Sequence, residues 1–365
     1  MKRIVVASDS FKGSLGSAEI VGLVRRTVAE RWPGCPVDAV SVADGGEGTA
    51  AAFVDNCGYR PVQCRTEDAL RRPIEAWYAL SADGTEAVID TAAAAGLSGA
   101  MRHDGTYDPM RATTVGLGLM MRHALEGGAQ SLVLGLGGSA TTDCGTGMLA
   151  ALGWIFEDEF GQRTGMGGGS CLSKITRVIP CPARIPRLTA LCDVAAPLYG
   201  SRGAACVFGP QKGADPAQVL ELDRGLRHIA AIIDDEAALT PGAGAAGGLG
   251  YAVRACLGGT LQSGIDRILD SADFDSLIAG ADLVLTGEGC YDSQTGMGKA
   301  VSGIVARCRH AGVPVALIAG RIADGADTSA FAHAVEVTPR RMPLAEAMQP
   351  DTARRLYTRA LDTIL

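Results

Sequence analysis

The chain repeats one pattern from its first residues: a short run of β-branched residues, a polar loop rich in glycine, and then an amphipathic or alanine-rich helix. Arg3–Ala7 predicts a strand, the loop SDSFKGS follows it, and Ala18–Trp32 predicts a helix that Ser17 can cap. Strands that alternate with helices form parallel sheets covered on both faces. The sequence therefore predicts an α/β fold, and its 365 residues are enough for two domains.

The pattern weakens in the middle of the chain, where paired short runs replace it. Ile74–Leu80 and Glu86–Asp90 predict antiparallel strands around the turn Ala82-Asp83-Gly84. We therefore expect a Rossmann-like or flavodoxin-like domain with a parallel sheet, split by an inserted mixed α/β domain. The expected boundaries are residues 1–72 plus 282–365 for the split domain and residues 73–281 for the inserted one.

Composition excludes several classes of protein. The formal net charge is −7 and no basic run occurs, so a nucleic-acid partner is not expected. The eleven cysteines contain no CxxC pair and the five histidines lie far apart, which argues against structural zinc and a disulfide framework. No apolar stretch is long enough for a signal peptide or a membrane span. We expect a cytoplasmic enzyme that handles small molecules, and the sequence is compatible with a homodimer.

Lysines at glycine-rich turns are the first candidates for chemistry. Arginine outnumbers lysine 28 to 5, yet Lys12, Lys212 and Lys299 all lie beside glycine in polar loops. An ammonium group is a compact, mobile charge that suits contact with a phosphoryl group. Chance placement on a solvated loop is the alternative for each of the three.

A glycine-rich loop, LGLGGSATTDCGTGM, follows the predicted strand Ser131–Leu134. Glycines after a strand let backbone N–H groups turn toward an anion, and the start of the next helix adds its positive dipole end. Candidates for binding an anion are therefore Gly137, Gly138, Ser139 and Thr141.

The same loop is compatible with a second class of protein. Gly135–Ala140 fits the dinucleotide pattern GxGxxA, and the acidic pair Glu157 and Asp158 follows about twenty residues later. That spacing is typical of an NAD(P)-dependent oxidoreductase. This interpretation leaves the lysine loops without a role, and it stays open as an alternative.

Acidic residues follow several predicted strands. Asp9, Asp44 and Glu47 lie at the strand ends where open α/β sheets bind ligands, and they could hold Mg²⁺ directly or through water. Asp44 and Glu47 could instead only cap a helix. Asp193 follows the predicted strand Thr189–Cys192, and phosphoryl transfer to an alcohol calls for one such carboxylate to accept the hydroxyl proton.

Together these stretches resemble a known family. From Ile4 to about Gly320 the chain is similar to the bacterial glycerate kinases of the two-domain type (class II), through the blocks ASDSFKGS, ADGGEGT, GLGGSATTDCGTGM, CDV..PLYG, AACVFGPQKGA, GAGAAGGLG, SGID and TGEG.D.QT..GK. The resemblance implies ATP-dependent phosphorylation of D-glycerate, usually at the 2-hydroxyl, with Mg²⁺. It also implies a split Rossmann-like domain, an inserted domain and an active site in the cleft between them.

With this resemblance, roles follow for the candidate residues. Asp193 is expected to orient or deprotonate the substrate hydroxyl, while three cations neutralise the phosphates: Lys12, Lys212 and Lys299. Ser10 and Lys12 are expected to join the glycine-rich loop in binding ATP. The expected Mg²⁺ shell is Asp44, Glu47, Glu288 and Asp292, and the expected substrate contacts are Arg111, Asp193 and Gln211.

Thr286–Lys299 resembles the acidic loop of this family and not a P-loop. A P-loop needs glycine four residues before its Gly-Lys pair and Ser or Thr after it, but Ser293 and Ala300 stand at those positions. Lys299 is expected near the start of a helix, beside the acidic side chains.

The sequence also departs from the family. Cys290 and Tyr291 stand where the family usually has Arg and Leu, and Ala196 stands where it usually has Asn. Loss of the arginine removes a bidentate donor, and loss of the asparagine removes a donor and an acceptor. The replacement cation could be Arg111, Arg202 or Arg321. Three outcomes stay open: the same activity with a rearranged site, another small hydroxy acid as substrate, or weak or lost catalysis.

Overall fold

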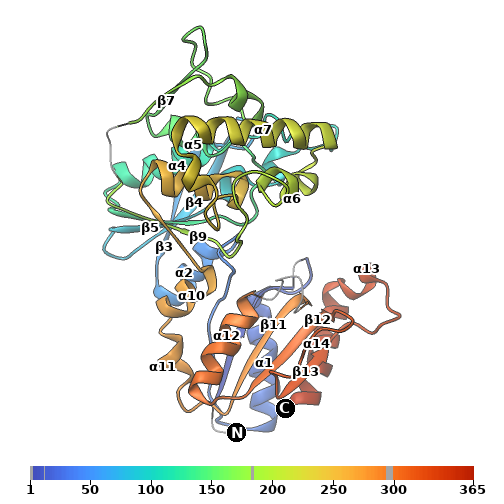
Figure 1. The fold of residues 1–365 in the computed structure, drawn as a ribbon. Helices are drawn as coiled ribbons and strands as arrows, with labels where there is room; N and C mark the ends of the chain where they lie inside the picture. Colours follow the sequence, from blue (N-terminus) through green and yellow to red (C-terminus); the bar gives the residue numbers. More distant parts are fainter. Residues whose placement is uncertain (1–2, 12, 182–184, 293–298) are drawn as a thin grey trace. The chain divides into compact units, whose positions relative to one another are not determined.

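The computed structural model describes residues 3–11, 13–181, 185–292 and 299–365, the side chain of Lys299 excepted. The chain divides into two compact units (Figure 1). Unit 1 consists of Met1–Ala43 and Ile265–Leu365, and unit 2 consists of Asp44–Gly264. Both units have the α/β architecture that the sequence predicts.

Unit 1 is built on a parallel sheet. Its strands are β1 (Ile4–Ser8), β2 (Val37–Ala39), β11 (Leu283–Tyr291), β12 (Val315–Ile322) and β13 (His333–Glu336). Among the described residues these five strands lie in the order β13-β12-β11-β1-β2, and all neighbours are parallel. Counted within the unit, this is the 2-1-3-4-5 order of flavodoxin-like folds. The strand order reverses between β1 and β11, which is where such sheets bind ligands at their carboxyl edge.

Helices cover both faces of the unit 1 sheet. On one face, α1 (Ser17–Arg31) and α14 (Pro350–Ile364) pack against alternate residues of the strands, such as Ile4 and Leu285. Val284, which precedes Leu285 on β11, faces the opposite layer, because successive side chains of a strand point to opposite faces. The opposite layer consists of α10 (Gly264–Ser271), α11 (Phe274–Ile278) and α12 (Lys299–Ala311). The short α13 (Leu344–Ala347) precedes α14.

Unit 2 contains a mixed sheet. Its strands are β3 (Arg60–Glu67), β4 (Pro73–Leu80), β5 (Glu86–Asp90), β6 (Ser131–Gly135), β9 (Arg187–Leu191) and β10 (Thr260–Gln262). Within the described chain they lie in the order β10-β9-β6-β5-β4-β3. β3, β4 and β5 are antiparallel neighbours, which confirms the predicted antiparallel runs. β5, β6, β9 and β10 are parallel, so their carboxyl ends share one edge.

One large hydrophobic core lies around the unit 2 sheet, with Leu117, Met120, Leu134, Leu226 and Ile229 among its fully buried residues. The longer helices of the unit are α2 (Thr49–Cys57), α4 (Val115–Glu126), α5 (Thr146–Ala151) and α7 (Pro216–Ile233). The shorter ones are α3 (Ala92–Ala95), α6 (Ala204–Phe208), α8 (Asp235–Ala238) and α9 (Leu249–Tyr251). Short 3₁₀ helices are η1 (Ser98–Ala100), η2 (Gly169–Lys174), η3 (Pro210–Lys212) and η4 (Ala245–Gly247), and η5 (Ala252–Cys256) is a short π-helix. A separate pair of strands is formed by β7 (Ile155–Glu157) and β8 (Arg177–Ile179).

The borders between the units differ from the expected ones at 72/73 and 281/282. β3 is hydrogen-bonded to β4 along its whole length, so a border at 72/73 would separate paired strands. The carboxylate of Asp90, at the end of β5, accepts hydrogen bonds of 2.9 Å from the N–H groups of Gly48 and Ala50 at the start of α2. Residues 44–72 therefore belong to unit 2. α10 and α11 pack on the unit 1 sheet, which moves the second border to Gly264.

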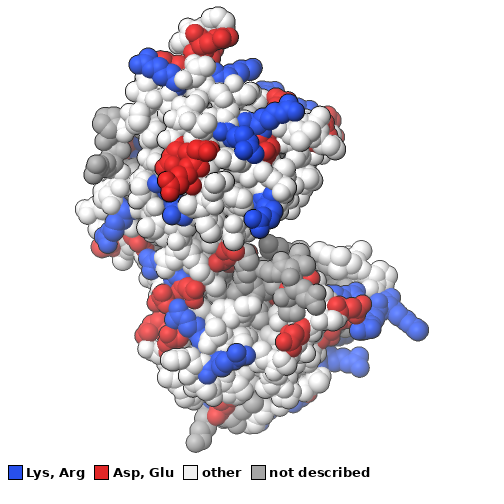
Figure 2. All heavy atoms as spheres, viewed as in Figure 1, with Lys and Arg blue, Asp and Glu red and all other residues white. Residues whose placement is uncertain are grey.

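The surface carries charges of both signs. On the face drawn in Figure 2, positive and negative side chains are interspersed over both units. All eleven cysteines lie among the described residues, and none of them forms a disulfide. Within the described part of the chain, no helix has both the length and the apolar character that crossing a bilayer requires.

Candidate active site

The carboxyl edge of the unit 2 sheet brings several sequence-predicted residues together. The ADGGEG loop, residues 43–48, lies across the ends of β6 and β9: Gly137 N donates to Gly45 O at 3.2 Å. A Cβ built on Gly137 would lie 2.6 Å from Gly46 Cα, and one on Gly45 would lie 2.9 Å from Leu191 Cβ. These positions have no room for a side chain, so the glycines are needed for the close approach of the loops.

The candidate ligands on this edge come from three different loops. Asp44 and Glu47 have exposed side chains on the ADGGEG loop, and the exposed backbone of Gly138 is close to Glu47, since a Cβ on Gly138 would be 4.0 Å from Glu47 Cβ. Asp193 follows β9 and is held by Gly264 N, which donates to its Oδ1 at 3.3 Å. A Cβ on Gly264 would in turn lie 2.5 Å from Asp44 O. Asp44, Glu47, Gly137, Gly138 and Asp193 therefore share one edge of one sheet.

The rest of the glycine-rich loop is fixed by buried polar contacts. The hydroxyls of Ser139 and Thr141 are 2.9 Å apart, and both residues are buried. Asp143 is fully buried and accepts bonds from Thr113 Oγ1 at 3.1 Å and from Thr114 N at 2.8 Å. Burial raises the pKa of Asp143, and the hydrogen bonds from Thr114 and Gly145 oppose that rise. The loop is thus tied to the start of α4.

Lys212 lies beneath this loop and not on the surface. Its side chain is 4% exposed and its Nζ donates to Thr141 O at 2.6 Å. Burial lowers the pKa of Lys212 to about 8, and the nearby charge of Asp143 acts in the opposite direction. Lys212, which was expected to neutralise phosphate charge, is therefore buried in the described structure and donates to the glycine-rich loop.

Besides Asp193, unit 2 carries two further expected substrate contacts, Arg111 and Gln211, and both are exposed. Arg111 donates only its backbone N, to Asp108 Oδ1 at 3.2 Å, among the contacts of the described residues. Gln211 lies exposed on the η3 turn beside the buried Lys212. Neither position is tied by a described contact to the edge that carries Asp193.

The carboxyl edge of unit 1 carries a second set of predicted residues. Asp9 follows β1 and its N donates to Gly287 O of β11 at 3.0 Å, while Ser10 N donates to Asp9 Oδ1 at 2.6 Å. Glu288 lies on β11 and Asp292 just beyond it, both half-buried. These residues lie at the point where the strand order reverses. Lys12 is outside the described residues, and of Lys299 only the backbone, at the start of α12, is described.

The four expected Mg²⁺ ligands divide between the units: Asp44 and Glu47 belong to unit 2, and Glu288 and Asp292 to unit 1. Among the described residues, no three His, Cys, Asp or Glu side chains form a cluster that could hold a metal ion. Two carboxylates per edge are nevertheless compatible with Mg²⁺, which binds through one or two carboxylates and keeps several waters.

The structure argues against the dinucleotide alternative. That motif needs the acidic residue at the end of the strand next to the glycine loop in the same sheet. Glu157 instead ends β7, which pairs with β8 in a separate sheet, and it is ion-paired with Arg177 at 3.3 Å. In addition, α5 starts only at Thr146, well after Gly135 at the end of β6.

The departures from the family pattern have different environments. Cys290 is exposed on β11 and is the Cα partner of Arg321 on β12. Tyr291 is buried: its ring lies 5.5 Å from that of Phe331, edge to face, and its hydroxyl donates to Asp327 O at 3.1 Å. In the described part of the chain, the Ala196 carbonyl accepts a hydrogen bond from Gly244 N at 2.9 Å. Of the three arginines considered as replacements, Arg321 is the one on a strand beside Cys290.

Sequence reasoning missed Asp90, which lies on the same edge as Asp193. It is buried, and burial raises its pKa to about 6 although Ala50 and Gly48 donate to it. The signal was present, because Asp90 ends an apolar run in the same way that Asp193 follows one. Its role is to hold the start of α2, and with it the ADGGEG loop, against the sheet.

Both units end their parallel strands in polar, glycine-rich loops, which is the arrangement of α/β enzymes that bind small ligands. A sequence model of the glycerate kinase family matches residues 4–365. The chain belongs to the glycerate kinase family, and it is therefore a kinase.

Individual relatives agree with this assignment. The glycerate kinase of Bacillus subtilis (strain 168) is 38% identical over 359 residues, 95% of this chain and 93% of that protein. The glycerate 2-kinase of Escherichia coli (strain K12) is 38% identical over 334 residues, 88% of this chain and 86% of that protein. The crystal structure of a candidate glycerate kinase 2 from Salmonella typhimurium LT2 superimposes with a TM-score of 0.83 at 34% identity, and covers 99% of this chain and 96% of that chain.

Proposed function

We propose that the protein transfers the γ-phosphoryl group of ATP to the 2-hydroxyl of D-glycerate, with Mg²⁺. Relatives that share about nine-tenths of the chain bear the names glycerate kinase and glycerate 2-kinase. The observation that carries the proposal is the carboxyl edge of unit 2, where Asp193 meets the ADGGEG loop and the glycine-rich loop.

Asp193 is the proposed proton acceptor. The substrate hydroxyl oxygen forms a bond to the γ-phosphorus, the bond from that phosphorus to the bridging oxygen breaks, ADP leaves, and the hydroxyl proton passes to the Asp193 carboxylate. The hydrogen bond from Gly264 N to Oδ1 fixes the orientation of this carboxylate. Such a step needs a positioned acceptor more than an unusually strong base.

The phosphates are proposed to contact backbone N–H groups of the glycine-rich loop. Gly137 N already donates to Gly45 O, so this role falls to the exposed Gly138 and to Ser139. Gly138 has a φ of +77°, a conformation that turns backbone groups outward and that glycine adopts without strain. Thr141 supports the loop through its hydroxyl contact with Ser139 and through its carbonyl contact with Lys212.

Mg²⁺ would neutralise phosphate charge when bound, and the exposed carboxylates of Asp44 and Glu47 are the proposed ligands in unit 2. Glu288 and Asp292 are the corresponding proposal for unit 1. Ser10, Lys12, Lys299, Arg111 and Gln211 keep the roles predicted for them from the sequence. A site that draws on both units, a cytoplasmic location and a homodimer likewise stay predictions.

The test is a coupled assay of ADP release over D-glycerate, L-glycerate and longer sugar acids, followed by phosphorus NMR of the product. We expect turnover with D-glycerate and a phosphomonoester signal on carbon 2. Turnover with a different acid alone would replace the proposed substrate, and ATP binding without turnover on any acid would contradict the proposed activity. Titration with NADH, which should not bind, separates the kinase from an oxidoreductase.

A further inference from the structure

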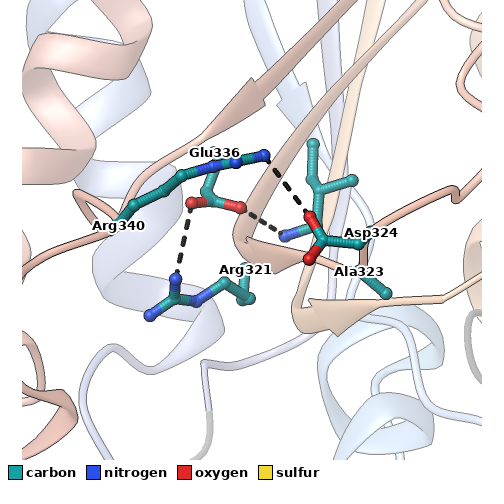
Figure 3. A pocket seen from close by; sticks show the side chains of 6 residues that line it. Arg321, Ala323, Asp324, Glu336 and Arg340 are labelled. Atoms are coloured by element: carbon teal, nitrogen blue, oxygen red, sulfur yellow. Dashed lines mark hydrogen bonds and ion pairs between the residues drawn. The ribbon is translucent and has the colours of Figure 1, made fainter.

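Unit 1 has a pocket of about 350 Å³ at the carboxyl ends of β12 and β13. We call it the Arg321 pocket; it is lined by Arg321, Ile322, Ala323, Asp324, Glu336 and Arg340 (Figure 3). A second hollow of about 340 Å³ shares most of this lining and extends it toward Thr328. The volume is within the range of roughly 300–1,000 Å³ that small-molecule sites occupy.

One carboxylate at the centre of the pocket is fixed. Glu336 Oε2 accepts a hydrogen bond of 2.9 Å from Ile322 N. Its other oxygen lies 3.8 Å from Arg321 Nη1, so the guanidinium is oriented by Glu336 without a close hydrogen bond. Figure 3 shows both contacts converging on Glu336.

Both guanidinium groups can turn to a ligand at little cost. The Arg321 side chain is 40% exposed in its pair with Glu336. Arg340 Nη2 lies 3.4 Å from Asp324 Oδ1, and those two side chains are 81% and 94% exposed. Exposed ion pairs of this kind contribute little to stability. A ligand that offers a better acceptor therefore has little to displace.

The position of Arg321 connects the pocket to the ligand-binding edge of the sheet. Tyr291 of β11 and its partner Ile322 of β12 pack toward Val301 of α12. Because successive side chains alternate, the preceding partners Cys290 and Arg321 point to the other face. Cys290 lies on β11, where the strand order reverses, so Arg321 stands on the strand next to that point.

We propose that the Arg321 pocket binds the anionic oxygens of a small phosphate- or carboxylate-bearing molecule. Arg321 is the bidentate donor and Arg340 is a second cation. The carboxylates of Glu336 and Asp324 accept hydrogen bonds from hydroxyl groups of the same molecule. The proposed function supplies two sources of this chemistry, ATP and the hydroxy acid, and the naming of these two ligands rests on it.

The experiment compares Arg321→Met and Arg340→Met with Arg341→Met, a neighbouring exposed arginine outside the pocket lining. Binding of ATP and of D-glycerate to the full chain is measured separately by calorimetry, and KM and kcat are measured for both. We expect Arg321→Met to weaken one of the two ligands at least tenfold, Arg340→Met to weaken the same ligand about threefold, and Arg341→Met to leave both unchanged. The affected ligand identifies the source of the anion, and Arg321→Lys should restore part of the affinity.

Unchanged affinity for both ligands in Arg321→Met would overturn the proposal while leaving the kinase activity intact. If the wild type bound neither ligand, the proposed function would fail, and inorganic phosphate becomes the probe. Phosphate should then shift the Arg321 Nε–H signal in NMR spectra of the wild type, and a signal that does not move would equally overturn the proposal. Thermal unfolding of each variant establishes that the comparison is made between folded proteins.

Discussion

The two sheet edges are built in different ways. In unit 2, loops approach through glycine backbones, and the charged groups that hold them, Asp143 and Lys212, are buried. In unit 1, the pocket at the edge is formed by exposed side chains in loose pairs, such as Arg340 with Asp324. Removal of one partner from a buried polar pair lowers the free energy of unfolding strongly, whereas removal of one partner from an exposed ion pair changes it little. We therefore expect the unit 2 edge to be rigid and sensitive to substitution, and the unit 1 edge to be adaptable.

Asp193→Asn tests whether the edge of unit 2 carries the proposed reaction centre. It keeps the shape of the side chain but removes the proton acceptor, so kcat should fall about 10²–10⁴-fold while the free energy of unfolding changes little. Steady-state kinetics and urea denaturation measure the two effects. Asp351→Asn, at a 99% exposed side chain of unit 1, is the control and should leave kcat unchanged. Undiminished turnover in Asp193→Asn would remove this residue from the mechanism.

Lys212→Met tests the buried support of the glycine-rich loop. The change removes the donor to Thr141 O and the positive charge near Asp143. The free energy of unfolding should fall by about 2–3 kcal/mol, because the buried Thr141 carbonyl loses its hydrogen-bond donor and the buried Asp143 loses a nearby positive charge. Lys174→Met, at an exposed lysine of the same unit, should stay within about 0.5 kcal/mol of the wild type. Equal stability of the two variants in urea denaturation would contradict a supporting role for Lys212.

Gly137→Ala tests the close approach of the two loops. The new Cβ would lie 2.6 Å from Gly46 Cα, so backbone must move, and we expect a loss of about 1–3 kcal/mol in stability. A raised KM for ATP should accompany it if the loop binds phosphate. Gly22→Ala in α1 meets nothing within 4 Å and should stabilise the protein by about 0.5–1 kcal/mol. A stable Gly137→Ala variant with normal KM would show that the edge is more adaptable than proposed.

The pH dependence of stability tests the burial of Lys212 separately. The pKa of Lys212 is about 8 in the folded protein, and its ordinary value of 10.5 applies to the unfolded chain. Between pH 8 and 10.5 the unfolded chain therefore binds more protons than the folded protein. Stability of the wild type relative to Lys212→Met should therefore rise with pH from 8 to 10.5, by at most about 1.4 kcal/mol per pH unit. Denaturation of both proteins at several pH values measures this difference, and a constant difference would contradict the lowered pKa.

Arg340→Met should have the smallest effect on stability. Its pair with Asp324 is almost fully solvated, so the free energy of unfolding should change by less than about 0.5 kcal/mol. A loss above about 1 kcal/mol in urea denaturation would mean that the unit 1 edge is not made of loose pairs. The contrast between the two edges would then disappear.

The sequence predicted the α/β class and the parallel sheet because those depend on local patterns of apolar and glycine residues. The borders of the units could not be read in this way. They depend on the pairing of β3 with β4 and on the two hydrogen bonds that Asp90 accepts from the start of α2. Such long-range contacts leave no periodic signal in the chain.

Single site residues were predictable only as far as their strand positions. Asp193 follows a strand, and its place at a sheet edge follows from that position. Lys212 lies in a turn between glycines that resembles an exposed phosphate loop, but its contact with Thr141 spans 71 residues. Burial of a long side chain depends on which distant carbonyl it reaches, and composition does not reveal this.

The pairing of Cys290 with Arg321 limits how this edge can be re-engineered. Their Cα atoms are partners on adjacent parallel strands, so Cys290→Arg would set two guanidinium groups side by side on one face. Like charges placed opposite each other destabilise a sheet. A variant with a cation at position 290 would therefore also need a neutral residue at position 321. The two positions are best substituted together.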